Sequence, residues 1–232
     1  MKLMRFRALL LVLGTLLLPA LAFADIPLTF GARIGYSFPA GSAEKSVSLS
    51  DTTSGALPIQ LDAFYRITPK IHAGAYFSFG PAFNGAMASL AADGKASQSQ
   101  IRYGIQGQYH FASAPEVMDP WGGITLGFES ARLSTTPDSG GDKYSGSTSA
   151  FMFGVEGGVG WTVMNNLRVG PFLGIALGSY GSVSTTVTKH GVTTDGSIDI
   201  PETAIHTWIT LGVSGTFSLG SAPVVAAEPE AN

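Results

Sequence analysis

A period-two alternation of apolar with small or polar residues constrains this fold most, and it recurs in eight segments. In the first segment, Phe30, Ile34 and Phe38 alternate with Thr29 and Arg33. Successive side chains of a β-strand point to opposite faces, so each segment has one apolar face and one small or polar face. The segments cover residues 28–38, 57–67, 71–79, 101–111, 124–129, 151–163, 167–177 and 205–219. Most are about 10 to 13 residues long, which fits a tilted transmembrane strand better than a soluble strand of about five or six.

The N-terminus has the pattern of an export signal. Lys2, Arg5 and Arg7 precede an apolar run over 8–18, and an Ala-Phe-Ala cleavage motif follows. The alternative is a transmembrane anchor helix, but the run is shorter than the roughly 20 apolar residues that span a bilayer. We therefore predict a cleaved signal peptide over residues 1–24.

Composition excludes several function classes. Three of the 13 Lys and Arg residues lie in the predicted signal peptide, so 10 remain against 16 Asp and Glu, a net charge of −6. Such a chain lacks the basic surface that nucleic acids require. The sequence has no cysteine, which excludes a disulfide scaffold, a thiol nucleophile and a lipid-modified N-terminal cysteine. The four histidines lack metal-ligand spacing, and we predict no metal site and no cofactor.

Long and short connections alternate along the chain. The long ones are rich in Ser, Thr, Gly and Asp and cover 39–56, 81–98, 134–148 and 181–203. The shorter ones are 68–70, 112–120 and 164–166. Outer-membrane barrels have short periplasmic turns and longer extracellular loops, so the alternation predicts the orientation of the barrel. Asp93-Gly94 and His190-Gly191 suit tight turns, which predicts hairpins in two of the long loops.

Aromatic residues on the apolar face fall near the two ends of the segments, whereas the middle is mostly Ala, Ile, Leu and Val. A soluble β-domain also alternates but would gather its large rings centrally. Two aromatic girdles around an aliphatic band are typical of a barrel in a membrane. The predicted girdle residues are Phe30, Tyr36, Phe38, Tyr65, Phe77, Phe79, Tyr103, Tyr109, Phe111, Phe128, Phe151, Phe153, Trp161 and Phe217. The glycine-rich opposite face suits the narrow interior of eight strands.

These features predict an all-β fold, an eight-stranded antiparallel transmembrane β-barrel of up-and-down topology over residues 25–219. The strand 28–36 behind the signal peptide and the final strand ending at 215–219 resemble the OmpA-type outer-membrane β-barrel domains, which include small OmpX/Ail-like and OmpW-like barrels. The resemblance implies the outer membrane of a diderm bacterium. It also implies outer-membrane lipid, lipopolysaccharide and the barrel insertion machinery as partners. Such barrels often end at a terminal aromatic residue, whereas residues 220–232 here form an extension that we expect to be a disordered periplasmic tail.

Ionisable residues on the inner face are the main candidates for a site. Buried charges must be paired, so we predict a lumenal charge network. Its members are Arg33, Asp62, Arg66, Arg102, Glu129, Glu156 and Arg168. One interpretation is a network that fills and fixes the barrel interior. The other is a narrow pore for small solutes or ions, gated by exchange of salt bridges, with Arg33, Asp62, Glu129 and Arg168 as its members.

Barrels of this architecture include lipid-modifying enzymes, which need a serine and a histidine at the lipid-facing edge. Here His72, His110 and His206 lie on the inner face and His190 at a loop tip, so we predict no catalytic residue. The exposed loops 39–56, 81–98, 134–148 and 181–203 are the remaining candidates for binding an extracellular ligand. We therefore expect a structural and surface-interaction role rather than an enzyme, with the narrow pore as the alternative.

Overall fold

The computed structural model describes residues 27–45, 47–85, 95–112, 117–136, 143–189, 192–200 and 204–220. The predicted signal peptide, almost all of the predicted tail and the Asp93-Gly94 turn lie outside these residues. Among the described residues, no helix has the length and apolar character needed to cross a membrane.

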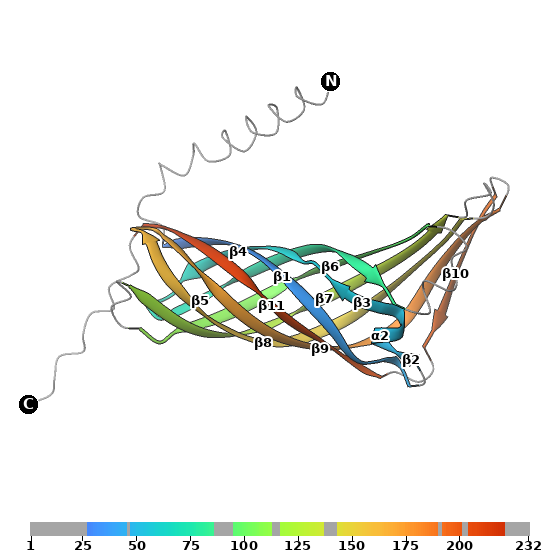
Figure 1. The fold of residues 1–232 in the computed structure, drawn as a ribbon, viewed down its shortest axis with the longest axis horizontal. Coiled ribbons are helices and arrows are strands. Elements are labelled where there is room, and N and C mark those ends of the chain that lie inside the picture. Colours follow the sequence, from blue (N-terminus) through green and yellow to red (C-terminus); the bar gives the residue numbers. More distant parts are fainter. Residues whose placement is uncertain are drawn as a thin grey trace, which may run out of the picture.

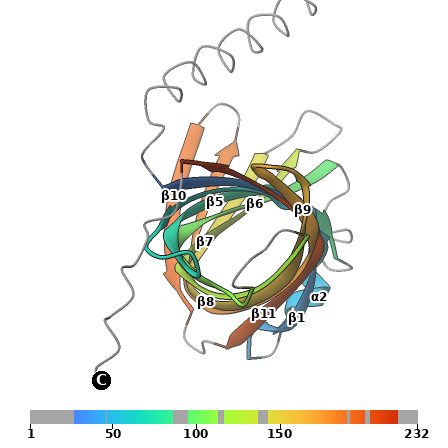
Figure 2. The ribbon, with the colours of Figure 1, turned by 90° about the vertical axis from the view of Figure 1, so that its left-hand side faces the viewer.

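Eight strands close into one antiparallel ring, which confirms the predicted fold class (Figures 1 and 2). The ring strands are β1 (Leu28–Glu44), β4 (Ile59–Arg66), β5 (Ile71–Asn84), β6 (Lys95–His110), β7 (Met118–Thr136), β8 (Lys143–Met164), β9 (Leu167–Lys189) and β11 (Ile205–Leu219). Each pairs with the next along the chain. The first and last strands then close the ring, from Leu28 opposite Leu219 to Gly41 opposite His206.

The two ends of the barrel differ. The turn end carries the short β4–β5, β6–β7 and β8–β9 connections together with the start of β1 and the end of β11. The loop end carries the predicted long connections, and much of their length is regular structure (Figure 1). The additional elements there are β2 (Val47–Ser48), α2 (Leu49–Thr52), β3 (Thr53–Ala56) and β10 (Val192–Asp199).

The strands run further than the alternation predicted. The sixth and seventh strands were predicted over residues 151–163 and 167–177, but β8 has 22 residues and β9 has 23. Residues 192–199, predicted as loop, pair with β9 from Val192 opposite Lys189, so the predicted hairpin around His190-Gly191 has its two arms. The segment 39–56 was predicted as one loop and instead holds the end of β1, β2, α2 and β3.

Apolar side chains face outward around the ring. Every residue predicted for the aromatic girdles is exposed except Tyr36. The Tyr36 ring is half-buried because it packs on Phe38 and Phe83, at centroid distances of 4.7 and 6.1 Å. Its hydroxyl donates to the Ser54 carbonyl oxygen at 3.3 Å. The outer face is therefore the apolar one, as the alternation predicted.

Glycine is required where neighbouring strands approach closely. A Cβ atom on Gly170 of β9 would lie 1.7 Å from the Val159 carbonyl oxygen of β8, which no real contact allows. Gly41 near the loop end of β1 has a φ of 75°, a conformation that residues with a side chain rarely adopt. A Cβ there would also lie 2.6 Å from the Ile205 carbonyl oxygen. Such positions let the strands approach closely while the lumen is filled by large polar side chains.

Candidate functional site in the barrel lumen

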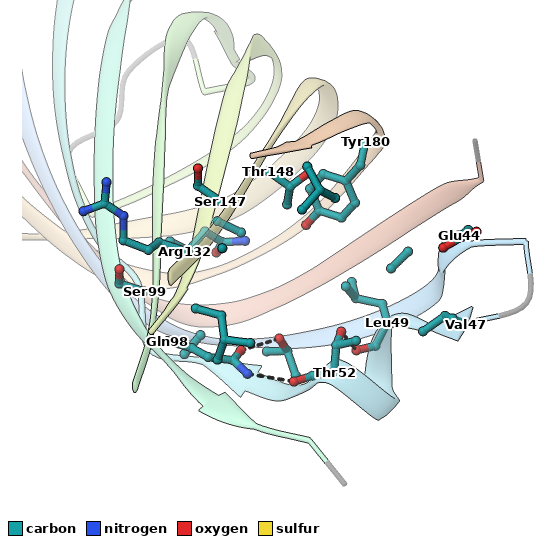
Figure 3. Close-up of a pocket in the computed structure, with 18 of the residues that line it drawn as sticks. Glu44, Val47, Leu49, Thr52, Gln98, Ser99, Arg132, Ser147, Thr148 and Tyr180 are labelled. Carbon is teal, nitrogen blue, oxygen red and sulfur yellow. Dashed lines mark hydrogen bonds between the residues drawn. The ribbon is translucent and has the colours of Figure 1, made fainter. Parts of the chain in front are cut away.

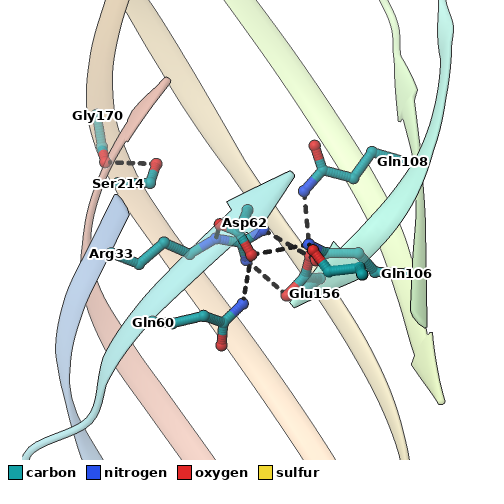
Figure 4. A network of polar contacts seen from close by, with 9 residues as sticks. Arg33, Gln60, Asp62, Gln106, Gln108, Glu156, Gly170 and Ser214 are labelled. Carbon is teal, nitrogen blue, oxygen red and sulfur yellow. Dashed lines mark hydrogen bonds and ion pairs between the residues drawn. The ribbon is translucent and has the colours of Figure 1, made fainter. Parts of the chain in front are cut away.

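The middle of the lumen is closed by Arg33, which reaches from β1 to two carboxylates (Figure 4). Its Nε donates to Asp62 Oδ2 at 2.7 Å, and Asp62 lies on the adjacent strand β4. Its Nη1 donates to Glu156 Oε2 at 2.7 Å, and Glu156 lies on β8, which is not a neighbour of β1 in the ring. The guanidinium also lies 5.2 Å from the Trp121 ring centroid and 5.5 Å from that of Phe172. Arg33 and its two carboxylates thus bridge the lumen; we call them, with the glutamines below, the middle layer.

Three glutamines complete the hydrogen bonding of the middle layer. Gln60 and Gln106 donate to Asp62 Oδ1 at 2.8 and 2.7 Å, and Gln108 donates to Glu156 Oε1 at 3.2 Å. Gln106 also accepts a hydrogen bond from Arg33 Nη2 at 3.2 Å. Two carboxylates share one arginine here, so the amide donors stabilise the additional negative charge.

A second layer lies toward the loop end and centres on Glu129, whose exposed fraction is 0%. Arg102 Nε donates to Glu129 Oε2 at 2.9 Å, and the Tyr180 hydroxyl donates to Oε1. The Tyr180 ring stacks on His206 at a centroid distance of 4.0 Å, and the Arg102 guanidinium lies 5.0 Å from the Trp208 ring centroid. We call this group the loop-side layer. It brings side chains from four strands together on the loop-end side of the middle layer.

A third layer lies at the turn end and centres on Asp119. Arg168 Nη1 and His110 Nδ1 both lie 2.8 Å from Asp119 Oδ2. The His110 ring packs on His72 at a centroid distance of 4.0 Å. We call this group the turn-side layer. Asp119 falls in the segment 112–120 that was predicted as a connection, but β7 begins at Met118 and turns this carboxylate into the lumen.

The structure corrects the predicted charge network in two respects. Arg66 was predicted as a member, but it donates to the backbone carbonyl oxygens of Leu219 and Gly220, and no ion pair of Arg66 occurs among the described residues. The proposed gate residues do not form one cluster either. Arg33 pairs with Asp62, whereas Glu129 and Arg168 lie in the two other layers. Within the described part of the chain, no ion pair joins one layer to another.

Three cavities lie along the barrel between and beyond these layers. The largest, about 320 Å³, opens at the loop end above Tyr180 and Trp208, and we call it the loop-end cavity (Figure 3). A second, about 60 Å³, lies between the loop-side and middle layers and is lined by both Arg33 and Arg102. A third, about 20 Å³, lies between Arg33 and the turn-side layer. Side chains of the layers therefore interrupt the path through the barrel.

Sequence reasoning missed several lumenal residues. Tyr180 lies two residues after Gly178, and Trp208 two residues after His206, so both alternate to the inner face of their strands. Neither was predicted as an inner residue. Gln60, Gln106 and Gln108 also alternate to the inner face, but no role was predicted for them. The alternation alone could have identified all of these residues. Among the described residues, no group of three or more His, Asp or Glu side chains is arranged to hold a metal ion.

No protein-family model matches the chain, and comparison with curated proteins finds no match. Among solved structures, the chain is similar to a major outer membrane protein from Thermus thermophilus. The sequence identity is 13% and the TM-score is 0.51, over 82% of this chain and 98% of that one. Also similar are Neisserial surface protein A (13% identity, TM-score 0.46, 81% and 95% coverage) and Ail, the attachment invasion locus protein of Yersinia pestis (13%, 0.42, 83% and 99%). The likeness to the Thermus protein shows a shared fold, that of an outer-membrane β-barrel, in agreement with the fold that the sequence resemblance implied.

Proposed function

We propose that the protein is an outer-membrane β-barrel with a closed lumen, which acts through its loop end in a structural and surface-interaction role. The turn end would face the periplasm and the loop end the outside of the cell. Outer-membrane lipid and lipopolysaccharide would surround the apolar face, and the barrel insertion machinery would place the chain in the membrane. The segments 39–56, 81–98, 134–148 and 181–203 would meet an extracellular ligand.

The inverted arrangement of side chains supports the membrane location. Phe77, Ile105 and Leu211 are 49, 63 and 57% exposed on the outer face, while Arg33, Asp62 and Glu129 are buried inside. In a soluble protein this apolar band would be exposed to water, and such exposure is strongly unfavourable. In a bilayer the band contacts lipid tails, and aromatic rings at its two borders lie at the headgroup level.

The observation that carries the proposed role is the Arg33–Glu156 ion pair across the lumen. It joins strands that are not neighbours in the ring, is mostly buried, and is backed on both sides by the other two layers. An open channel would leave such groups hydrated. In planar lipid bilayers we therefore expect the wild-type barrel to give no stable ion current at neutral pH. Steady single-channel openings of the wild type would contradict the closed-lumen proposal.

Single cysteine variants test the orientation, because the natural sequence has no cysteine. Thr194→Cys places a thiol on exposed β10 at the loop end, and Asn166→Cys places one at an exposed turn. A membrane-impermeant maleimide added to intact cells should label Thr194→Cys alone, and both after the outer membrane is permeabilised. Labelling of Asn166→Cys on intact cells would reverse the proposed orientation.

A narrow gated pore is the second candidate, and the three cavities in series favour it. Arg33 lines two of them and pairs with both Asp62 and Glu156, so release of one of these ion pairs would join the cavities. For a gate, Asp62→Ala or Glu129→Ala should raise single-channel conductance in planar bilayers. If both variants fold and stay closed like the wild type, the gate is excluded and the filling role remains.

A further inference from the structure

The loop-end cavity has an apolar wall and a closed floor (Figure 3). Leu49 of α2 is buried in the wall, and Ala131 and Val183 line it from β7 and β9. Tyr180 and Trp208, which are 4 and 2% exposed, close the floor. The volume of about 320 Å³ is roughly twice that of a cavity that holds one benzene molecule. The space therefore suits a body of about two fused rings.

One buried donor of this cavity has no acceptor in the described part of the chain, in contrast to its neighbour on the same face. Gln98 uses its whole amide group: its Nε2 donates to the Thr52 carbonyl oxygen at 2.8 Å, and its Oε1 accepts from Thr53 Oγ1 at 2.6 Å. Gln100, only 4% exposed, lines the same cavity, but its Nε2 has no partner among the described residues. The Trp208 indole N–H differs from it, because it lies near the Tyr180 hydroxyl. Leaving buried donors unpaired is costly, so a site that does so is suited to a molecule that supplies the acceptor.

The charges at the cavity indicate that this molecule is neutral. Among the described residues, two charged side chains line it, Glu44 and Arg132, and they have opposite signs. The charge nearest the floor, Glu129, already pairs with Arg102. A charged ligand would lose its hydration in the apolar space without gaining a counter-charge.

We propose that the loop-end cavity is a binding site for small uncharged molecules with an apolar body of about two rings and a carbonyl or ether oxygen. The body fills the space between α2, β7 and β9, and the oxygen accepts a hydrogen bond from Gln100 Nε2. The site does not depend on whether the lumen conducts, because Tyr180 and Trp208 of the loop-side layer form its floor and separate it from the middle layer.

A pair of probes of the same shape tests the proposal on the wild-type protein. 2-Acetylnaphthalene carries the acceptor, and 2-isopropylnaphthalene lacks it. Titration into ¹⁵N-labelled protein in lipid nanodiscs is followed through the indole N–H signals of Trp208, Trp121 and Trp161. Trp161 faces outward and reports partition into lipid, whereas Trp121 lies in the lumen toward the turn end. We expect a saturable shift of the Trp208 signal with the acetyl compound, because the Trp208 ring lines the cavity, and affinity about fivefold weaker for the isopropyl compound.

Variants separate the apolar and polar parts of the site. Gln100→Leu should weaken binding of the acetyl compound about fivefold and leave that of the isopropyl compound unchanged. Ala131→Leu, which fills the cavity, should weaken both. Tyr144→Phe, on the exposed face of β8, is the matched control and should change neither. Heat-modifiable mobility on gels verifies that each variant is folded, and Gln100→Met replaces any Gln100→Leu protein that is not.

Three results would overturn the proposal. The first is a Trp208 shift that does not saturate or that parallels the Trp161 shift, which indicates partition into lipid only. The second is equal affinity for the two probes, which removes the acceptor requirement. The third is binding that Ala131→Leu leaves intact, which places the probes elsewhere.

Discussion

The middle layer of the lumen and the loop-end cavity share strands β1, β6 and β8, but their polar groups are paired to different extents. In the middle layer, Arg33 has two carboxylate partners and Gln106 three hydrogen bonds. At the cavity, Gln100 keeps a buried N–H group without an acceptor among the described residues. The difference separates two uses of a buried polar side chain. Full pairing fixes the barrel, whereas a spare donor beside an empty apolar space is available to a ligand.

The contrast also follows the geometry of the barrel. In the middle, side chains from opposite strands meet across the lumen, as Arg33 and Glu156 do. Beyond the loop-side layer, α2 and β3 form part of the wall and leave the loop-end cavity open. Among the described residues, unpaired buried atoms also occur in the loop-side and turn-side layers, at Arg102 Nη2 and Asp119 Oδ1, whereas the middle layer has none.

The largest effect is expected from Arg33→Met. The substitution keeps most of the side-chain length but leaves Asp62 and Glu156 buried without their cation, which should lower the free energy of unfolding by about 3–5 kcal/mol. Urea titration in phospholipid vesicles measures the loss. Arg66→Met is the control, because Arg66 hydrogen-bonds to backbone carbonyl groups and has no ion pair among the described residues, and it should cost clearly less. Equal losses would mean that the middle layer has no special role in stability.

A smaller effect is expected from Glu129→Gln in the loop-side layer. The shape is kept, but the ion pair with Arg102 becomes a neutral hydrogen bond, so the loss should be about 1.5–3 kcal/mol in the same titration. Because Glu129 lies below the floor of the loop-end cavity, binding of 2-acetylnaphthalene should change little. A large loss of binding with normal stability would show that the cavity and the loop-side layer are one unit.

The smallest effect is expected from Trp208→Phe. The substitution keeps an aromatic ring beneath Arg102 and removes the indole N–H, which lies near the Tyr180 hydroxyl without a well-aligned hydrogen bond. Only ring area and this weak contact are lost, so the free energy of unfolding should fall by no more than about 1 kcal/mol. Thermal unfolding of both proteins in detergent checks this value. A loss above about 2 kcal/mol would mean that the indole N–H and the Tyr180 hydroxyl form a full hydrogen bond.

The alternation predicted the barrel well because it depends only on neighbours along each strand. It placed Arg33, Asp62 and Glu156 on the inner face, and the structure joins these three. It could not divide the charges into layers, because the layers depend on which residues of distant strands lie at the same level along the barrel axis. The four-residue helix α2 gave no signal, since a run of Leu, Ser, Asp and Thr is too short for helical periodicity.

The pairing of polar groups at the loop-end cavity could not be predicted from the sequence. Gln98 and Gln100 share a strand and a face, yet one is paired and the other is not, because Thr52 and Thr53 approach only the first. Those partners are 45 and 46 residues away in the chain. The alternation along a strand therefore indicates which side chains enter the lumen. The hydrogen-bond partner of each one can be identified only once the strands are closed into the ring.

A matched pair of substitutions on β6 tests the division of the lumen most directly. Gln106 and Gln100 lie on one strand and one face, and each is 4% exposed. In urea titrations in phospholipid vesicles, Gln106→Leu should lower the free energy of unfolding by about 2–4 kcal/mol, because Arg33 and Asp62 each lose a buried partner. Gln100→Leu should leave it unchanged or raise it slightly, because its Nε2 has no partner to lose. Equal losses at the two positions would contradict the distinction between a fully paired middle layer and a loop-end cavity with spare donors.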